Sequence, residues 1–277
     1  MKVHVENISK DLLDILRIDC SNCSGLCCVA LFFSKMDGFP QNKEAGKACI
    51  NLNKDFKCRI HSDLEKQKMK GCIGYDCFGA GQQVTKTIYS GETWLSDHKK
   101  SQKIFDVFII IFQLHQMLWY LGEARTIIFA KNLWKDIDKL INENIKICNS
   151  QEDDILKYNI EEYRDKVNNI LKKVSNAVKS NFNGNKDNNR AYLGKKFKNK
   201  NFNGVDLSMS LLIAADFENC SFHGTNFLGA DTRDTNFSNC DLREAIFLTQ
   251  GQINSALGNS KTLLPYNLTI PSTWKQE

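Results

Sequence analysis

The chain has 277 residues, of which 42% are hydrophobic and 25% charged, and its formal net charge at pH 7 is +5. This length allows one large domain or two to three small ones, and the uneven composition favours several parts. So small a positive excess does not by itself indicate a nucleic-acid-binding protein. The N-terminus has no basic region followed by an apolar one, so we expect no secretory signal and a cytoplasmic location.

Cysteine is concentrated near the start of the chain. Eight of the eleven cysteines lie in the first 77 residues, beginning with CSNCSGLCC at position 20. A reducing cytoplasm disfavours disulfides, and thiolates are typical ligands of zinc and iron. Glycines interrupt residues 20 to 90, so we expect bound metal rather than a large apolar core to hold this region. Eight thiols suffice for two four-cysteine sites, or for one site with cysteines left over; buried reduced thiols or a disulfide staple are the alternatives.

The cysteine pattern resembles a known bacterial family. The segment CxxCxxxCC, the later CRIH and the later GCIGYDC together resemble a domain described as zinc- or iron-chelating, over roughly residues 20 to 82. Related motifs occur in flagellin lysine methylases, for which an iron-sulfur cluster is suspected. The resemblance implies Zn or Fe as cofactor, with an iron-sulfur cluster as one form of the iron, and it implies as ligands Cys20, Cys23, Cys27, Cys28, Cys49, Cys58, Cys72 and Cys77. We interpret His61 as an ordinary hydrogen-bonded residue rather than a ligand.

The middle of the chain has helical periodicity. Residues 104 to 121 are long and apolar enough to span a membrane, but Asp106, Gln113 and His115 interrupt them, so we expect a buried helix and no membrane span. Apolar residues then recur at steps of three and four from Ile127 to Ile145, which predicts an amphipathic helix. Ser150 and Asp153 have capping-box spacing and predict the start of a third helix, which continues to Val178.

A period of five follows an Asn- and Gly-rich stretch. A large residue recurs at every fifth position, with Thr232 as the exception, and a small residue stands two positions before most of these large residues. An odd period would send successive large residues to opposite faces of a straight strand, so the chain must turn once per repeat. The large positions are Phe197, Phe202, Leu207, Leu212, Phe217, Phe222, Phe227, Thr232, Phe237, Leu242 and Phe247. We therefore expect a coil with these side chains inside, and we expect Cys220 and Cys240 to be core residues.

The segments GVDLS, AADFE, GTNFL, GADTR and NCDLR resemble pentapeptide repeats, over residues 195 to 247. The resemblance implies a right-handed, four-sided β-helix. Thr249 and Gln252 have capping-box spacing and predict a short helix that closes the end of the coil. Some members of this family inhibit DNA gyrase by resembling DNA, but here the acidic excess is modest, so we keep this only as a minor alternative.

These observations predict an α+β, multi-domain protein. We expect an irregular Cys-rich metal-binding domain at 1–98, a helical region packed on it at 99–180, an Asn/Gly-rich linker at 181–194, and a right-handed quadrilateral β-helix with a C-terminal cap at 195–277. The predicted function is a Zn- or Fe-binding protein with a repeat scaffold that binds a protein or handles metal, with no membrane or nucleic-acid partner. The alternative is an iron-sulfur-dependent redox or modifying enzyme, although no independent catalytic motif is present.

Overall fold

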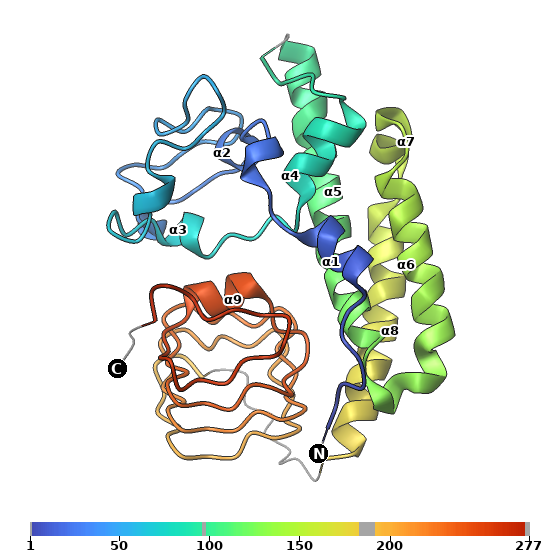
Figure 1. Ribbon diagram of the computed structural model, residues 1–277, viewed down its shortest axis with the longest axis vertical. Helices are drawn as coiled ribbons and strands as arrows, with labels where there is room; N and C mark the ends of the chain where they lie inside the picture. The colour runs from blue at the N-terminus through green and yellow to red at the C-terminus, as the bar shows by residue number, and fades with distance from the viewer. Residues whose placement is uncertain (1, 96–97, 183–191, 275–277) are drawn as a thin grey trace. The chain divides into compact units, whose positions relative to one another are not determined.

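A computed structural model describes residues 2–95, 98–182 and 192–274. The chain forms two compact units, each assembled from segments that are far apart in sequence (Figure 1). The first, here called the cysteine-helix unit, comprises residues 9–122 and 138–168. The second, here called the repeat unit, takes its described residues from 1–8, 123–137 and 169–277. The four-part domain division expected from the sequence stays a prediction, and most of the expected linker lies outside the described residues.

Short helices and turns make up the cysteine-rich part. Ser9 caps the first helix by accepting a hydrogen bond from the backbone N–H of Leu12. The elements in order are α1 (Lys10–Leu16), η1 (Cys20–Asn22), α2 (Leu26–Ala30), η2 (Lys35–Asp37), η3 (His61–Asp63), α3 (Lys70–Ile73), α4 (Ala80–Gln82) and η4 (Gln83–Ile88). This irregularity agrees with the glycine-punctuated sequence.

Longer helices follow. They are α5 (His98–Ala124), η5 (Ile128–Leu133), α6 (Trp134–Cys148), α7 (Glu152–Lys157) and α8 (Ile160–Ser180). The helix predicted from Ile127 begins as a 3-10 turn, and α6 proper starts at Trp134. The prediction of a single third helix from Ser150 is wrong. The helical conformation is interrupted at Tyr158 and Asn159, between α7 and α8. The Asn159 side chain accepts a hydrogen bond from Glu162 N and caps the start of α8.

A buried asparagine joins three of these helices. Asn144 on α6 donates from Nδ2 to the carbonyl oxygen of Leu114 on α5 at 2.9 Å and to the hydroxyl of Tyr163 on α8 at 3.2 Å. The Tyr163 hydroxyl donates in turn to the carbonyl oxygen of Leu140 at 2.9 Å. Because buried polar groups require partners, this network fixes how the helices pack within the cysteine-helix unit.

The apolar helix α5 keeps its polar residues in different surroundings. Its segment Lys99–Ala124 is long and apolar enough to cross a membrane, yet 61% of its most apolar window is buried within the protein. Asp106 is exposed, whereas His115 is fully buried and its Nδ1 lies 2.7 Å from the carbonyl oxygen of Phe78. The core helix of a soluble protein passes the same length and composition test, so the absence of a membrane span stays a prediction.

The repeats form a stack of turns with a register of twenty residues, drawn in orange and red in Figure 1. Isolated parallel bridges join residues twenty apart, such as Asn201 to Ser221 and Asp216 to Asn236. The large residues predicted to point inward are buried from Phe202 to Phe247, and Cys220 and Cys240 are core residues as predicted, 2% and 1% exposed. The predicted cap is confirmed: α9 (Gln250–Ser255) closes one end, with Thr249 and Gln252 in a capping box.

The predicted fold class is wrong in one respect. Within the described ranges there is no β-strand and no sheet, so the expected α+β architecture with a quadrilateral β-helix does not form. The reason is that the backbone turns too often for a strand to form. The chain bends after every bridge, often through a residue with positive φ such as Asn199, Asn219 or Asn239, so successive residues do not pair and no strand is built.

Candidate functional sites

The predicted ligands all lie in the cysteine-helix unit, on short helices and on the loops between them. Cys20 is the first residue of η1, and Cys23 directly follows its last residue. Cys27 and Cys28 lie on α2, and Cys72 lies on α3. None of the eleven cysteines forms a disulfide. The disulfide crosslinks that the sequence left open as an alternative are therefore absent from this structure.

Backbone pairing draws three of the cysteines toward one another. The N–H of Cys49 donates to the carbonyl oxygen of Cys28 at 2.9 Å. Cys58 pairs with Leu52 through an isolated antiparallel bridge, and the N–H of Leu52 donates to the carbonyl oxygen of Cys49 at 3.0 Å. The loop between Cys49 and Cys58 therefore folds back so that both of its ends lie near α2.

Burial and neighbouring thiols together raise the pKa of several cysteines. Burial, followed by the charges of Cys28, Cys49 and Cys58, raises the pKa of Cys72 to about 12. Burial, Asp76 and Cys23 raise the pKa of Cys77 to about 11. Cys28 also acts to raise the pKa of Cys20, Cys23 and Cys27, so its charge affects thiols throughout the cysteine-rich part.

Cys27 and Cys28 are adjacent on α2 and interact directly. Their sulfur atoms are 3.9 Å apart. The hydrogen bond between them, the largest cause, raises the pKa of the Cys27 thiol and lowers that of Cys28. The ammonium group of Lys43 also lowers the pKa of Cys28, and its Nζ donates to the carbonyl oxygens of Val29 and Leu31.

The donor set has the chemistry of a soft-metal site, but the side chains are not gathered around one point. Among the described residues, no three His, Cys, Asp or Glu side chains are placed so that they could hold one ion. The hydroxyl of Tyr75 is buried without a hydrogen-bond partner, and Cys27, Cys77 and Cys23 contribute, after burial, to raising its pKa. The eight ligands therefore stay a prediction, as does the interpretation of His61.

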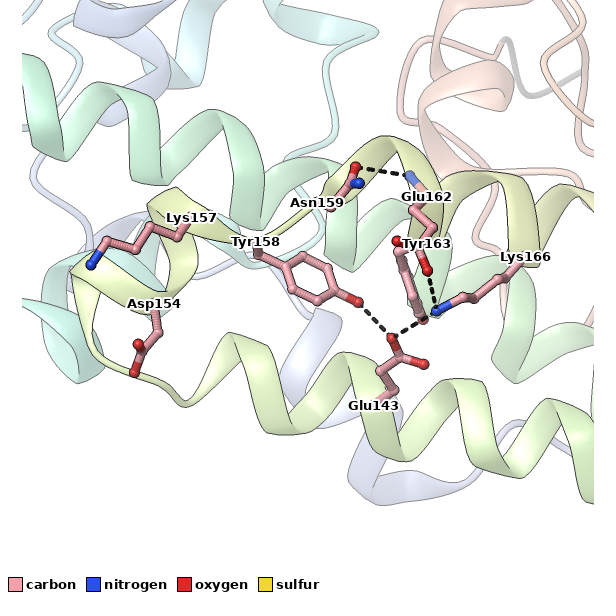
Figure 2. Close-up of a pocket in the computed structure, with 8 residues that line it drawn as sticks. All are labelled: Glu143, Asp154, Lys157, Tyr158, Asn159, Glu162, Tyr163 and Lys166. Carbon is pink, nitrogen blue, oxygen red and sulfur yellow. Dashed lines mark hydrogen bonds and ion pairs between the residues drawn. The ribbon is translucent and has the colours of Figure 1, made fainter.

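A pocket of about 420 Å³ lies over α6, α7 and the start of α8 (Figure 2). Figure 2 shows Tyr158 and Lys166 both directed at Glu143; the tyrosine hydroxyl donates to Glu143 Oε1 at 2.9 Å and the Lys166 ammonium lies 3.6 Å from it. Lys166 also pairs with Glu162 at 3.1 Å. The side chains of Glu143, Tyr158, Glu162 and Lys166 therefore partner one another within the pocket.

Four acidic side chains on the repeat stack are paired with cations. Lys198 lies 3.3 Å from Asp216 and 2.5 Å from Glu218. Arg233 pairs with Asp231 at 2.6 Å and Arg243 with Asp241 at 2.7 Å. This charge compensation does not favour the DNA-resembling surface kept as a minor alternative, since that role needs uncompensated negative charge.

The sequence analysis missed two buried charged residues. Lys43 is 8% exposed beside the cysteines, and Glu123 is 4% exposed near the end of α5. The sequence contained a pattern that could have identified Glu123, because this acidic residue directly follows a long apolar helix face. Lys43 had none, since its burial depends on the fold of the surrounding loops.

Comparison with known proteins gives two matches. The model of the family "Pentapeptide repeats" matches residues 201–233 and 210–247, with eight copies. A protein of Bacillus subtilis strain 168, described as "uncharacterized protein YybG", is 44% identical over 275 residues, covering 98% of this chain and 97% of its own. No solved structure matches significantly.

Proposed function

The chain belongs to the family of YybG and carries pentapeptide repeats in its C-terminal region, and from this we propose that it is a cytoplasmic protein-interaction scaffold. The observation that supports this role is the twenty-residue register of the stack. It repeats outward-facing side chains in columns over successive coils, and repeat proteins use such regular surfaces to bind partners.

Three exposed apolar side chains near the start of the stack suit a protein partner. Leu193, Met209 and Leu211 are 60%, 69% and 52% exposed. The N–H of Tyr192 donates to the carbonyl oxygen of Leu211 at 3.2 Å, which places Leu193 next to the same part of the coil. Neighbouring exposed apolar side chains favour burial against another protein surface.

Leu211→Asp tests this proposal. Partners are captured on the full-length protein, purified, and their dissociation constants measured with each variant. We expect Leu211→Asp to weaken binding about tenfold or more, because a charge would have to be buried at the interface. Leu257→Asp is the matched control, since Leu257 is a similarly exposed leucine at 53% near the other end of the stack. Equal binding by wild type and Leu211→Asp would reject this surface as the interface.

A second proposal concerns the thiol-rich part of the cysteine-helix unit. We propose that it binds Zn or Fe through the eight predicted cysteines. Its support is the density of reduced thiols around the adjacent Cys27 and Cys28. Because no three donors surround one point, metal binding would have to draw the thiols together, so binding and local folding would be coupled.

Serine substitution separates ligands from core cysteines. We expect Cys58→Ser or Cys72→Ser to lower both the metal content and the melting temperature of anaerobically purified protein, because the ion would lose a thiolate. Cys148→Ser is the control: Cys148 is buried on α6, and its thiol donates to Asn144 Oδ1 at 3.4 Å, so metal content should not change. Wild-type protein free of zinc and iron, with thiols that alkylate readily in the native state, would refute the metal proposal and leave the scaffold proposal standing.

The iron-sulfur enzyme remains the alternative for the same cysteines. An iron-sulfur cluster absorbs visible light, whereas zinc does not, so the absorption spectrum of the anaerobic protein distinguishes the two. A colourless protein that contains zinc would support the non-redox form of the proposal.

A further inference from the structure

The first residues of the chain are held tightly within the repeat unit. We call residues 2–8 the N-terminal strap. The N–H groups of Val3 and His4 both donate to Glu244 Oε2, at 2.6 and 3.3 Å, which attaches the strap to the last part of the stack. Val5 N donates to the carbonyl oxygen of Thr126 at 3.0 Å. Val3 and Ile8 are buried at 0% and 3% exposure, so the strap is packed as well as hydrogen-bonded.

A buried carboxyl group lies beneath this strap. Glu123 Oε1 accepts a hydrogen bond from the N–H of Phe247 at 2.8 Å, whereas Oε2 is buried without a partner. His4 Nε2 lies 4.0 Å from Glu123 Oε1 and 3.4 Å from the carbonyl oxygen of Ala245. An ionised carboxylate at this position would be poorly compensated, because a single backbone N–H is its hydrogen-bond donor here.

The hydrogen bonds of Thr126 determine where the His4 ring carries its hydrogen. The Thr126 hydroxyl donates its one proton to the carbonyl oxygen of Glu123 at 2.8 Å, so it must accept from His4 Nδ1, which lies 2.8 Å away. Nδ1 therefore carries a hydrogen. In neutral His4, Nε2 is then a bare acceptor that faces two other acceptors, Ala245 O and Glu123 Oε1. One additional proton either allows Nε2 to donate to Ala245 O, if it is on His4, or removes the buried negative charge, if it is on Glu123.

We propose that the N-terminal strap is a proton-gated latch on the repeat stack, closed while the Glu123–His4 pair holds that additional proton and released when the proton is lost. Release would leave a buried carboxylate beneath Val3 and His4. It would also free the side of the last coil that carries Glu244 and Ala245.

The direction of the pH dependence follows from burial. Burial raises the pKa of Glu123 from an ordinary 4.5 to about 8, opposed by the hydrogen bond from Phe247, and burial lowers the pKa of His4. At neutral pH the additional proton is therefore on Glu123. Closing the latch takes up a proton on Glu123 between about pH 4.5 and 8, but below the ordinary His4 pKa of 6.5 it also expels a proton from His4, so the two effects offset each other there and the closed state loses stability as pH rises mainly between about 6.5 and 8.

Other charged groups lie around the pair. Glu244 acts to raise the pKa of His4 and Lys2 to lower it. Tyr266 accepts a hydrogen bond from Ile8 N, and its own pKa is raised to about 12, above the relevant interval. Glu6 and Arg125 form an ion pair at 3.1 Å at the protein surface. None of these groups replaces the proton between Glu123 and His4.

Hydrogen exchange of the strap amides at Val3, His4 and Val5 tests the latch in the full-length protein. After correction for the intrinsic rate, we expect protection in wild type to fall by up to about tenfold per pH unit between pH 6 and 8. Glu123→Gln should abolish this slope, because the amide is neutral at every pH. Glu6→Gln is the control: it removes a half-exposed carboxylate from the same strap and should keep the slope.

Two results would overturn the latch. One is strap protection in wild type that does not change between pH 6 and 8, and the other is an equal slope in wild type and Glu123→Gln. Exchange at the amides of Phe217, Phe222 and Phe227 reports whether the variant's stack is folded. If it is not, the carbon chemical shift of the Glu123 carboxyl in wild type decides: titration near pH 8 supports the latch, and titration below pH 6 refutes it.

Discussion

Replacing Phe222 with alanine is expected to lower the free energy of unfolding of the repeat unit by about 3–5 kcal/mol, the usual range for a fully buried phenylalanine. Phe222 is 0% exposed at the centre of the stack. Its ring lies 5.4 Å from those of Phe202, Phe217 and Phe227 and 5.8 Å from that of Phe237. The cavity would open between coils that backbone pairing holds at a fixed register, so neighbouring rings could fill little of it.

Urea-induced unfolding followed by circular dichroism measures this loss as a shift of the transition midpoint. Leu211→Ala is the matched control, because it also shortens a large apolar side chain in a repeat, but one that is 52% exposed. We expect the control to change the unfolding free energy by less than about 1 kcal/mol. Similar midpoints for the two variants would mean that packing among the buried phenylalanine rings around Phe222 is not the principal source of stability of the stack.

Replacing Gly38 with alanine is expected to destabilise the cysteine-helix unit by about 2–4 kcal/mol. Gly38 follows η2 with φ +91, a left-handed conformation that costs an alanine roughly 1–2 kcal/mol. A Cβ at this position would in addition collide with the backbone carbonyl oxygen of Lys68, next to α3. Overpacking of this kind adds about 1–3 kcal/mol, because the obstacle is main chain and cannot change rotamer.

Gly91 offers a control for the backbone contribution alone. It has the same φ of +91, but no atom lies within 4 Å of the position that its Cβ would occupy. Gly91→Ala should therefore lower stability by only about 1–2 kcal/mol in thermal denaturation followed by circular dichroism. If Gly38→Ala and Gly91→Ala are equally stable, the close approach of the η2 turn to Lys68 does not form in solution.

The period of five determined the inward side of the repeats without further information. It identified Phe217 and Phe222 as core residues and also placed the small Cys220 inside, because the pattern alternates large and small residues in a fixed order. It could not establish whether adjacent coils pair along strands. That depends on the backbone angles at each corner, and the corners come too often for strands to form.

The helices show the same limit. Apolar spacing predicted a helix up to Val178, but it could not reveal the break at Tyr158 and Asn159, since the stripe continues on both sides of it. In the cysteine-rich part, spacing identified candidate ligands, whereas the approach of Cys49 to Cys28 depends on how a distant loop folds back onto α2.

The sequence by itself determined which side chains the repeats bury, which part of the chain is helical and where thiols are concentrated, because these properties depend on residues close together in the chain. The tertiary structure alone decided that Glu123, His4 and Glu244 meet beneath the N-terminal strap. More than 100 residues separate His4 from the other two. No local pattern encodes such a meeting, since it exists only when the chain's first residues and the last part of the stack pack in one unit.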